Sequence, residues 1–145
     1  MSTINAMNVS ASGMTAQRLR MDIISQNIAN VNTTRDENGN PYRRKEVVFG
    51  EKDNSTFGDV LMRTSESVGN GVKVTQIVDD TNAEMRKVYD PSHPDADEDG
   101  YVTYPNVNIV QEMTDMIDAS RSYEANVTAF NATKNMALKG LEVGK

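Results

Sequence analysis

Apolar residues in the last third of the chain recur alternately four and three residues apart. This spacing predicts a helix over 107–145 that packs lengthwise on other helices. Ser120 and Lys134 interrupt the pattern with polar side chains, which makes it too weak for a stable isolated dimer and favours a larger, tightly surrounded assembly. We call the apolar positions of this pattern the assembly seam, and we use the same name for those of the N-terminal helix described next. In the C-terminal helix the seam residues are Ile109, Met113, Met116, Tyr123, Val127, Phe130 and Leu141.

The N-terminal 35 residues repeat the same spacing and predict a second helix, from Thr3 to about Asn30. Gly13 lies inside it, and glycine disfavours a helix, so we expect a local break or a close helix contact there. The asparagine-rich run 27–34 is expected to end the helix, with Asn27, Asn30 and Asn32 shaping the exit of the chain. The assembly seam continues here with Met7, Met14, Met21 and Ile28.

Between the two helices the pattern changes to short β-rich segments bounded by Gly, Pro, Asn and Asp. We predict four strands of one small antiparallel unit, over 45–49, 71–78, 85–89 and 101–104, with a polar loop at 50–70 and a turn around Asn38-Gly39. The expected fold is α+β: long antiparallel N- and C-terminal helices form a coiled-coil-like pair, with a small antiparallel β insert between them. The predicted units are 1–35, 36–106 and 107–145.

Composition supports a chain that completes its burial with neighbours. Hydrophobic residues are 37%, aromatic residues 6%, and tryptophan is absent, which is lean for a self-sufficient core. The net charge is −6 and is concentrated in the middle: the three units carry +2, −7 and −1. The run Arg43-Arg44-Lys45 is the one basic cluster, and we interpret it as a solvated patch, which argues against nucleic-acid binding.

The sequence also limits the cellular setting. Cysteine is absent, which excludes disulfides. No apolar run approaches the roughly 18 residues that span a bilayer, so we expect no direct membrane insertion. The first residues lack the basic start and apolar block of a signal peptide, so any export is expected to use another signal.

The acidic loop 95–100 is the best candidate for a metal site. Asp95, Asp97, Asp99 and Gly100 match the first positions of a calcium loop, but Asn106 stands where a bidentate Glu is required. An acidic turn that starts the strand at Tyr101 is the favoured interpretation, so no metal ligand is assigned. His93 is a lone histidine between prolines, expected to face solvent, and no nucleophile motif or phosphate loop occurs. We therefore expect no catalytic residue, no cofactor and no enzyme.

Two stretches carry a resemblance to a known family. The run Ser12-Gly13-Met14, followed by Ile24-Ser25-Gln26-Asn27-Ile28-Ala29-Asn30, and the tail around Arg121-Ser122-Tyr123-Glu124-Ala125-Asn126 resemble the signatures of bacterial flagellar axial proteins, the rod, hook and hook-associated subunits. The insert is most similar to proximal-rod members, although Arg43-Arg44 stands where many members have Arg-Ala. The family-motif residues are Ser25, Asn27, Ala29, Asn30, Asn32, Arg121, Tyr123, Glu124 and Asn126.

The resemblance implies a structural subunit of the proximal rod of the flagellar basal body, which transmits torque across the periplasm. It implies export by the flagellar type III apparatus without a cleaved signal peptide. The implied partners are other rod subunits, further copies of the chain, the membrane ring at the rod base and the export apparatus. Three alternatives stay open: another rod or hook-type axial subunit, a calcium-binding module that uses the 95–100 loop, and a coiled-coil adaptor.

Overall fold

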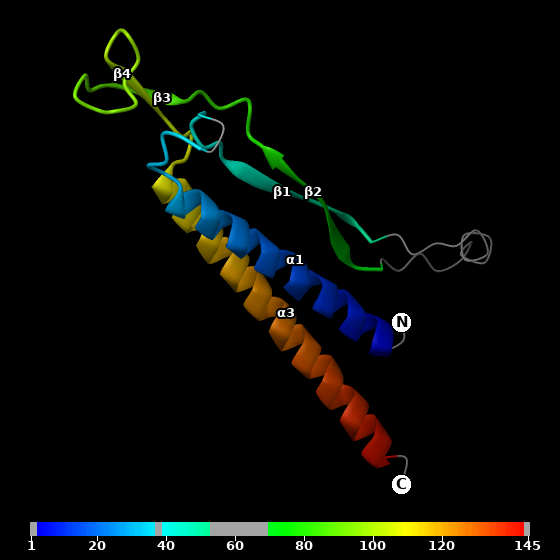
Figure 1. Cartoon of the computed structure of the whole chain (residues 1–145). Coiled ribbons are helices and arrows are strands. Elements are labelled where there is room, and N and C mark those ends of the chain that lie inside the picture. The colour runs from blue at the N-terminus through cyan, green and yellow to red at the C-terminus, as the bar shows by residue number, and fades with distance from the viewer. Residues whose placement is uncertain (1–2, 37–38, 53–69, 144–145) are drawn as a thin grey trace, which may run out of the picture.

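The computed structural model describes residues 3–36, 39–52 and 70–143. Helix α1 (Thr3–Ala29) opens the chain and helix α3 (Ile109–Val143) closes it. Between them lie strands β1 (Lys45–Glu51), β2 (Val72–Asp79), β3 (Arg86–Tyr89) and β4 (Tyr101–Tyr104). The two helices run antiparallel and in contact along the length of α1 (Figure 1). The predicted α+β layout, with two helices flanking a small β insert, is confirmed. The predicted loop 50–70 lies largely outside the described residues, and Asn38 of the predicted turn lies wholly outside them.

Helix α1 ends where the asparagine run begins to bond locally, as expected from the sequence. Asn30 Nδ2 donates to Gln26 O at 2.9 Å, and Thr33 Oγ1 donates to Asn30 Oδ1 at 3.1 Å. Side chains that bond their own backbone in this way compete with the helical ladder. The chain therefore leaves the helix after Ala29 and turns toward β1.

Gly13 marks a close approach of the two helices and not a break. Helix α1 continues without interruption from Thr3 to Ala29. A Cβ at Gly13 would lie 2.7 Å from Asn126 Oδ1, closer than a side chain tolerates. Of the two explanations that the sequence left open, the close helix contact is correct.

The four strands form two separate two-stranded antiparallel sheets, so the predicted antiparallel insert is confirmed, but its strands do not join in one sheet. Strand β1 pairs with β2, and β3 pairs with β4. The separation arises at Asp80, whose Oδ1 accepts the backbone N–H groups of Asn82 and Ala83 and so turns the chain away from β2. Asn106 fixes this turn by donating from Nδ2 to Asp80 O at 2.9 Å. Strand β3 consequently starts away from the first sheet.

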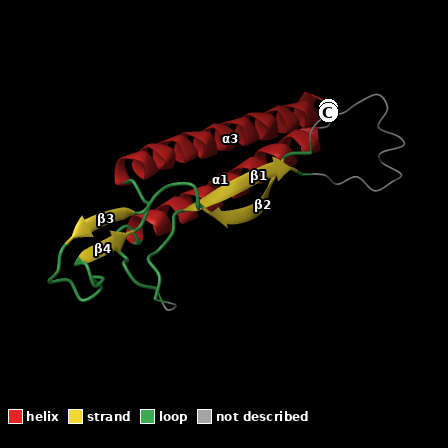
Figure 2. Cartoon of the chain, turned by 90° about the horizontal axis from the view of Figure 1, so that it is seen from above, coloured by secondary structure: helices red, strands yellow, loops and turns green. Residues whose placement is uncertain are grey.

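Helix α1 lies between α3 on one side and the β1–β2 ribbon on the other (Figures 1 and 2). The β3–β4 sheet projects beyond the end of the helix pair where α1 finishes and α3 begins. Among the described residues, it contacts no other helix or strand. Among the described residues the apolar core is thin and consists of Ala16, Ile24, Val102 and Ala119. Neither helix carries an apolar stretch sufficient to cross a membrane, within the part of the chain that the structure describes.

Candidate functional site: a polar junction and an exposed face of helix α3

A cluster of polar side chains joins the end of α1, the start of β1 and the start of α3. We call it the polar junction, and its centre is Asn27, which is 1% exposed. Asn27 Nδ2 donates to Lys45 O at 2.9 Å and to Glu112 Oε2 at 3.0 Å. Asn27 Oδ1 accepts from Lys45 N and from the hydroxyl of Tyr42, both at 2.9 Å. All four hydrogen-bonding positions of the amide are therefore occupied.

Glu112 is the second centre of the junction, with its side chain fully buried. Arg44 Nε donates to Glu112 Oε1 at 2.6 Å, and Arg44 also pairs with Glu46 and, at 3.5 Å, with Asp115 Oδ2. Arg44 is only 19% exposed, so the interpretation of 43–45 as a solvated patch was wrong for this residue. A buried carboxylate needs such a charged, hydrogen-bonded partner to offset the loss of water. Arg43, in contrast, is exposed.

Burial and charge shift two pKa values at the junction in directions that fit these contacts. Burial alone lowers the pKa of Arg44, but hydrogen bonds and charge from Glu112 and then Glu46 outweigh it, and the pKa is raised. The pKa of Tyr42 is raised mainly by burial, with the negative charges of Asp79 and Glu112 adding to the effect. Arg44 is therefore held charged and Tyr42 neutral, the forms that their hydrogen bonds require.

The residues of α3 that face α1 lie beside the assembly seam and do not coincide with it. The deepest positions of α3 are Glu112 and Ala119, and those of α1 are Ser10, Ala16, Ile24 and Asn27. Apart from Ile24, these residues are small or polar and carry no hydrophobic signal, so sequence periodicity missed them. The half-buried seam residues are Met7, Met14, Met21, Ile28, Met116, Tyr123, Val127 and Phe130, and the exposed ones are Ile109, Met113 and Leu141.

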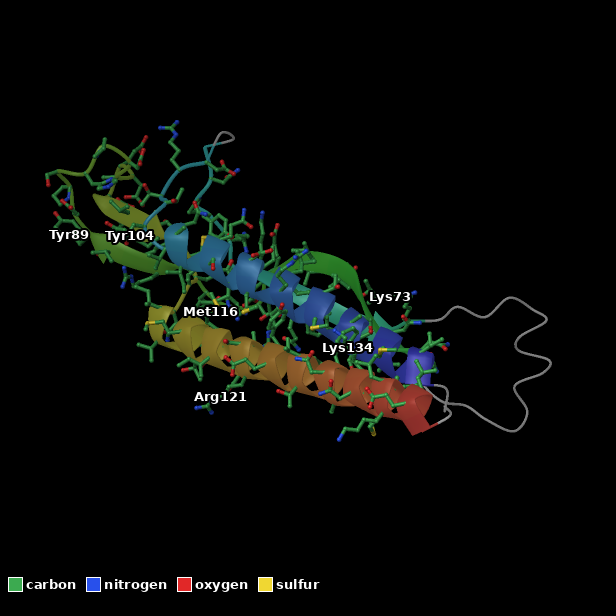
Figure 3. The ribbon with its side chains drawn as sticks, turned by 90° about the horizontal axis from the view of Figure 1, so that it is seen from below. Lys73, Tyr89, Tyr104, Met116, Arg121 and Lys134 are labelled. Carbon is green, nitrogen blue, oxygen red and sulfur yellow. The ribbon has the colours of Figure 1, made fainter. Side chains whose placement is uncertain are left out.

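Exposed apolar side chains gather on the first turns of α3. Ile109, Met113 and Ile117 follow one another at four-residue spacing on one side of the helix, with Val110 next to them. We call these four residues the α3 outer patch. At the other end of α3, Met136, Leu138 and Leu141 are also exposed, and a Cβ at Gly140 would have no neighbour within 4 Å. Arg121, midway, points away from α1 (Figure 3).

The family-motif residues divide into inner and outer positions. Asn27 is buried in the polar junction, and Asn30, Tyr123 and Asn126 are half-buried, with Asn126 at the close contact with Gly13. Asn126 Nδ2 donates to Ser122 O at 2.8 Å. The remaining motif residues are exposed, and they are Ser25, Ala29, Asn32, Arg121 and Glu124.

The acidic loop 95–100 is bonded to the protein itself. Asp95 accepts a hydrogen bond from Thr34 Oγ1 at 2.8 Å and pairs with Arg35 Nη1 at 3.5 Å. Asp97 Oδ1 accepts the backbone N–H groups of Asp99 and Tyr101, at 3.1 and 2.8 Å. These bonds form a turn that leads into β4, and the described residues contain no group of three acidic or histidine side chains arranged to hold a metal. The calcium-binding alternative is not favoured.

His93 is half-buried, which differs from the solvent-facing position expected for it. Its Nδ1 accepts the backbone N–H of Asp95 at 3.1 Å. The imidazole ring meets the ring of Tyr104 edge-on, with 6.5 Å between the ring centroids. The histidine therefore packs the loop against the β3–β4 sheet.

Two family models match the ends of the chain. The model described as "Flagella basal body rod protein" matches residues 7–35, and that described as "Flagellar basal body rod FlgEFG protein C-terminal" matches residues 98–143. Full-length relatives extend the match. The chain is 50% identical to the flagellar basal-body rod protein FlgC of Bacillus subtilis (strain 168), over all of both chains. The chain belongs to the FlgC family.

Other FlgC proteins show the same full-length similarity. The identity is 43% to FlgC of Borreliella burgdorferi, covering 99% of this chain and 98% of the relative. It is 38% to FlgC of Escherichia coli O157:H7, covering all of both chains. The FlgC similarity therefore includes residues 36–97 of the β insert, which the two family models leave unmatched. Both centres of the polar junction, Asn27 and Glu112, fall inside the segments that the family models match.

Proposed function

We propose that this chain is a non-catalytic structural subunit of the flagellar basal-body rod, in its proximal part, where it helps to transmit torque across the periplasm. The observation that carries the proposal is the full-length similarity to FlgC rod proteins. The exposed α3 outer patch supports it, because contiguous apolar surface on a small chain is typical of an interaction site. The geometry favours burial of this surface by neighbouring helices.

The three predicted units receive distinct roles in this proposal. Segments 1–35 and 107–145 form the helical core layer of the assembly, and the assembly seam together with the α3 outer patch packs against neighbouring subunits. Segment 36–106 carries the two small sheets outside this layer. The polar junction supports the division, since it fastens the start of β1 to both helices through Asn27, Arg44 and Glu112.

The proposed partners are other rod subunits, further copies of this chain and the membrane ring at the rod base. We further propose that the flagellar type III apparatus exports the chain to the basal body without a cleaved signal peptide. Because the helices complete their burial only with neighbours, we expect the chain ends of the free monomer to be poorly ordered. An isolated chain whose ends resist protease would contradict this expectation.

The test is deletion of the gene in its own bacterium, followed by electron microscopy of isolated basal bodies and a swimming assay. We expect rings without a complete rod and non-motile cells, rescued by the intact gene but not by one lacking residues 107–145. Normal rods and normal swimming would overturn the proposal. A rod interrupted at a more distal position would instead support the alternative of another rod or hook-type axial subunit.

A further inference from the structure

A groove between α1 and β2 lies at the end of the molecule opposite the β3–β4 sheet. It encloses about 460 Å³, and its walls include the apolar side chains of Ala16, Leu19, Val72 and Val74. Its rim carries three cations, Arg18, Lys52 and Lys73, against one acid, Asp22. The groove therefore combines an apolar floor with a positively charged edge.

The packing of β2 on α1 explains why the groove exists. Ser12 Oγ accepts the backbone N–H of Val72 at 3.0 Å and donates to Val9 O at 2.7 Å. Gly71 permits this close approach, because it adopts a φ of +98° and a Cβ there would collide with Ser12 Oγ. The alternation along β2 then turns Val72 and Val74 toward α1, while Lys73 between them is exposed and borders the groove. The strand is thus anchored at one point, and the groove opens beside it.

An exposed aromatic pair lies on the β3–β4 sheet at the other end of the molecule. Tyr89 is 64% exposed and Tyr101 43%, and their rings meet edge to face with 5.3 Å between centroids. Gly100 helps to fix the position of the pair, because a Cβ there would come within 3.0 Å of Tyr89 Cε2. We call Tyr89 and Tyr101, which pair across β3 and β4 and so lie on one face of the sheet, the aromatic tip.

The loop beside the aromatic tip is opposite in charge to the groove rim, while β3 adds two exposed cations, Arg86 and Lys87. Glu98 and Asp99 are exposed in the loop that leads into β4, and the side chain of neither forms an ion pair among the described residues. Large aromatic side chains surrounded by charge are typical of the centre and rim of protein interfaces. The aromatic tip therefore fits an apolar recess with a cationic rim, which is what the groove provides.

We propose that the aromatic tip of one copy docks into the α1–β2 groove of a second copy, with Glu98 facing Lys73 at the rim. Within one chain the two surfaces cannot meet, because Lys73 and Tyr89 lie at opposite ends of the molecule (Figure 3). The contact joins two different surfaces, so it repeats from copy to copy and builds a ring or a helical array. The inference rests on the proposed function in one respect, which is that copies of this chain lie next to one another in the rod.

Crosslinking of a double-cysteine variant tests the contact, and the natural chain contains no cysteine that could interfere. Glu98→Cys and Lys73→Cys are introduced together into a strain that lacks the native gene, and intact cells are treated with a short bismaleimide before basal bodies are isolated. We expect a ladder of dimers, trimers and larger species, since each copy has both halves of the contact. Each single variant should give no crosslink, and neither should the pair Glu98→Cys with Arg43→Cys.

Absence of a ladder from basal bodies that contain the double variant would overturn the docking and leave the rod proposal intact. Basal bodies that lack the native chain but have complete rods would instead overturn the rod proposal. Dimers from a single variant, or a ladder from the pair with Arg43→Cys, would also contradict the docking. They would indicate a symmetric contact or unselective proximity.

Charge reversal provides a second test that does not depend on crosslinking. Lys73→Glu and Glu98→Lys should each reduce the swimming-ring diameter to less than about half, because each places like charges at the rim. The double reversal should restore swimming, whereas Glu98→Lys combined with Arg43→Glu should not. Failure of the double reversal to restore swimming, with both single variants impaired and the protein present, would overturn the proposed pairing. A groove filled by another segment of the same chain would give this outcome.

Discussion

The polar junction and the α3 outer patch lie within a few turns of each other on α3 but have opposite character. The junction buries a carboxylate and an amide, Glu112 and Asn27, and supplies each with hydrogen bonds. The outer patch leaves Ile109, Met113 and Ile117 exposed. In a self-contained globular protein, the apolar side chains would occupy the interior and the charged ones the surface.

This inversion separates the interactions that fold the chain from those that assemble it. A buried polar network is costly when incomplete, so it selects one arrangement of α1, β1 and α3. An exposed apolar face contributes little to the stability of the monomer but can be buried by a neighbour. Substitutions at the junction are therefore expected to act on folding, and substitutions at the patch on assembly.

Glu112→Ala should have the largest effect on folding. It removes the acceptor for Arg44 Nε and for Asn27 Nδ2, both of which then lose a partner in a buried site. We expect the free energy of unfolding to fall by about 3 kcal/mol, the lower end for breaking a buried pair, because Arg44 keeps Glu46 and Asp115. Urea unfolding followed by circular dichroism measures the loss.

The matched control for that variant is Glu124→Ala, at an exposed position of the same helix. It should change the free energy of unfolding by no more than about 0.5 kcal/mol. Equal effects at the two positions would mean that the junction does not stabilise the fold more than an ordinary surface residue does.

Asn27→Ala should have the next largest effect. We expect it to lower the free energy of unfolding by about 2 kcal/mol, because it leaves several buried groups without partners. Those groups are Lys45 N and O, the hydroxyl of Tyr42 and one oxygen of Glu112. The same urea titration applies, with the exposed residue Asn131 changed to Ala for comparison. A loss as small as that of the comparison variant would show that Asn27 only ends the helix locally.

Gly13→Ala and Gly140→Ala form a pair that tests the close helix contact. At Gly140 a methyl group meets nothing within 4 Å, so the variant should gain up to about 1 kcal/mol of helix stability. At Gly13 the methyl group collides with the amide of Asn126, so the gain should be lost and the variant should melt at a lower temperature than Gly140→Ala. Thermal melting of both purified variants decides the order, and the reverse order would contradict the contact.

Tyr42→Phe should have the smallest effect, seen mainly at alkaline pH. The pKa of Tyr42 is raised in the folded chain above its ordinary value of 10.0. Above that value the unfolded chain releases the phenol proton before the folded chain does, so stability falls as pH rises through the folded pKa. The phenylalanine variant should lose less stability than the native chain over this range, as measured by urea unfolding at pH 9, 10 and 11 (roughly the range around the ordinary tyrosine pKa). Equal losses of unfolding free energy in the native chain and in the variant over this pH range would contradict the raised pKa of Tyr42.

The sequence predicted the helices and strands because their signals are local. The four-three spacing identified both helices, and runs of β-branched residues bounded by turn formers identified all four strands. The division into two sheets was not predictable in this way. It depends on Asn106 bonding Asp80 across 26 positions, a contact that no local pattern encodes.

The polar junction was the part of the site least accessible from sequence. Arg44 was interpreted as solvated because a basic run usually is, whereas its partner Glu112 lies 68 positions away. Ala119 and Ser10 escaped notice because small residues at a helix interface are not distinguished by hydrophobicity. Gly13 did carry a usable signal, since a helical glycine predicts either a break or a close contact.

The most direct test of the separation between folding and assembly measures Ile117→Glu and Glu112→Ala side by side, in urea unfolding and in swimming of the complemented deletion strain. We predict that Ile117→Glu unfolds within about 0.5 kcal/mol of the native chain yet abolishes swimming, because it places a charge on the α3 outer patch. Glu112→Ala should lose stability in the purified chain. Normal swimming with Ile117→Glu would contradict the account, since the patch would then not be an assembly surface.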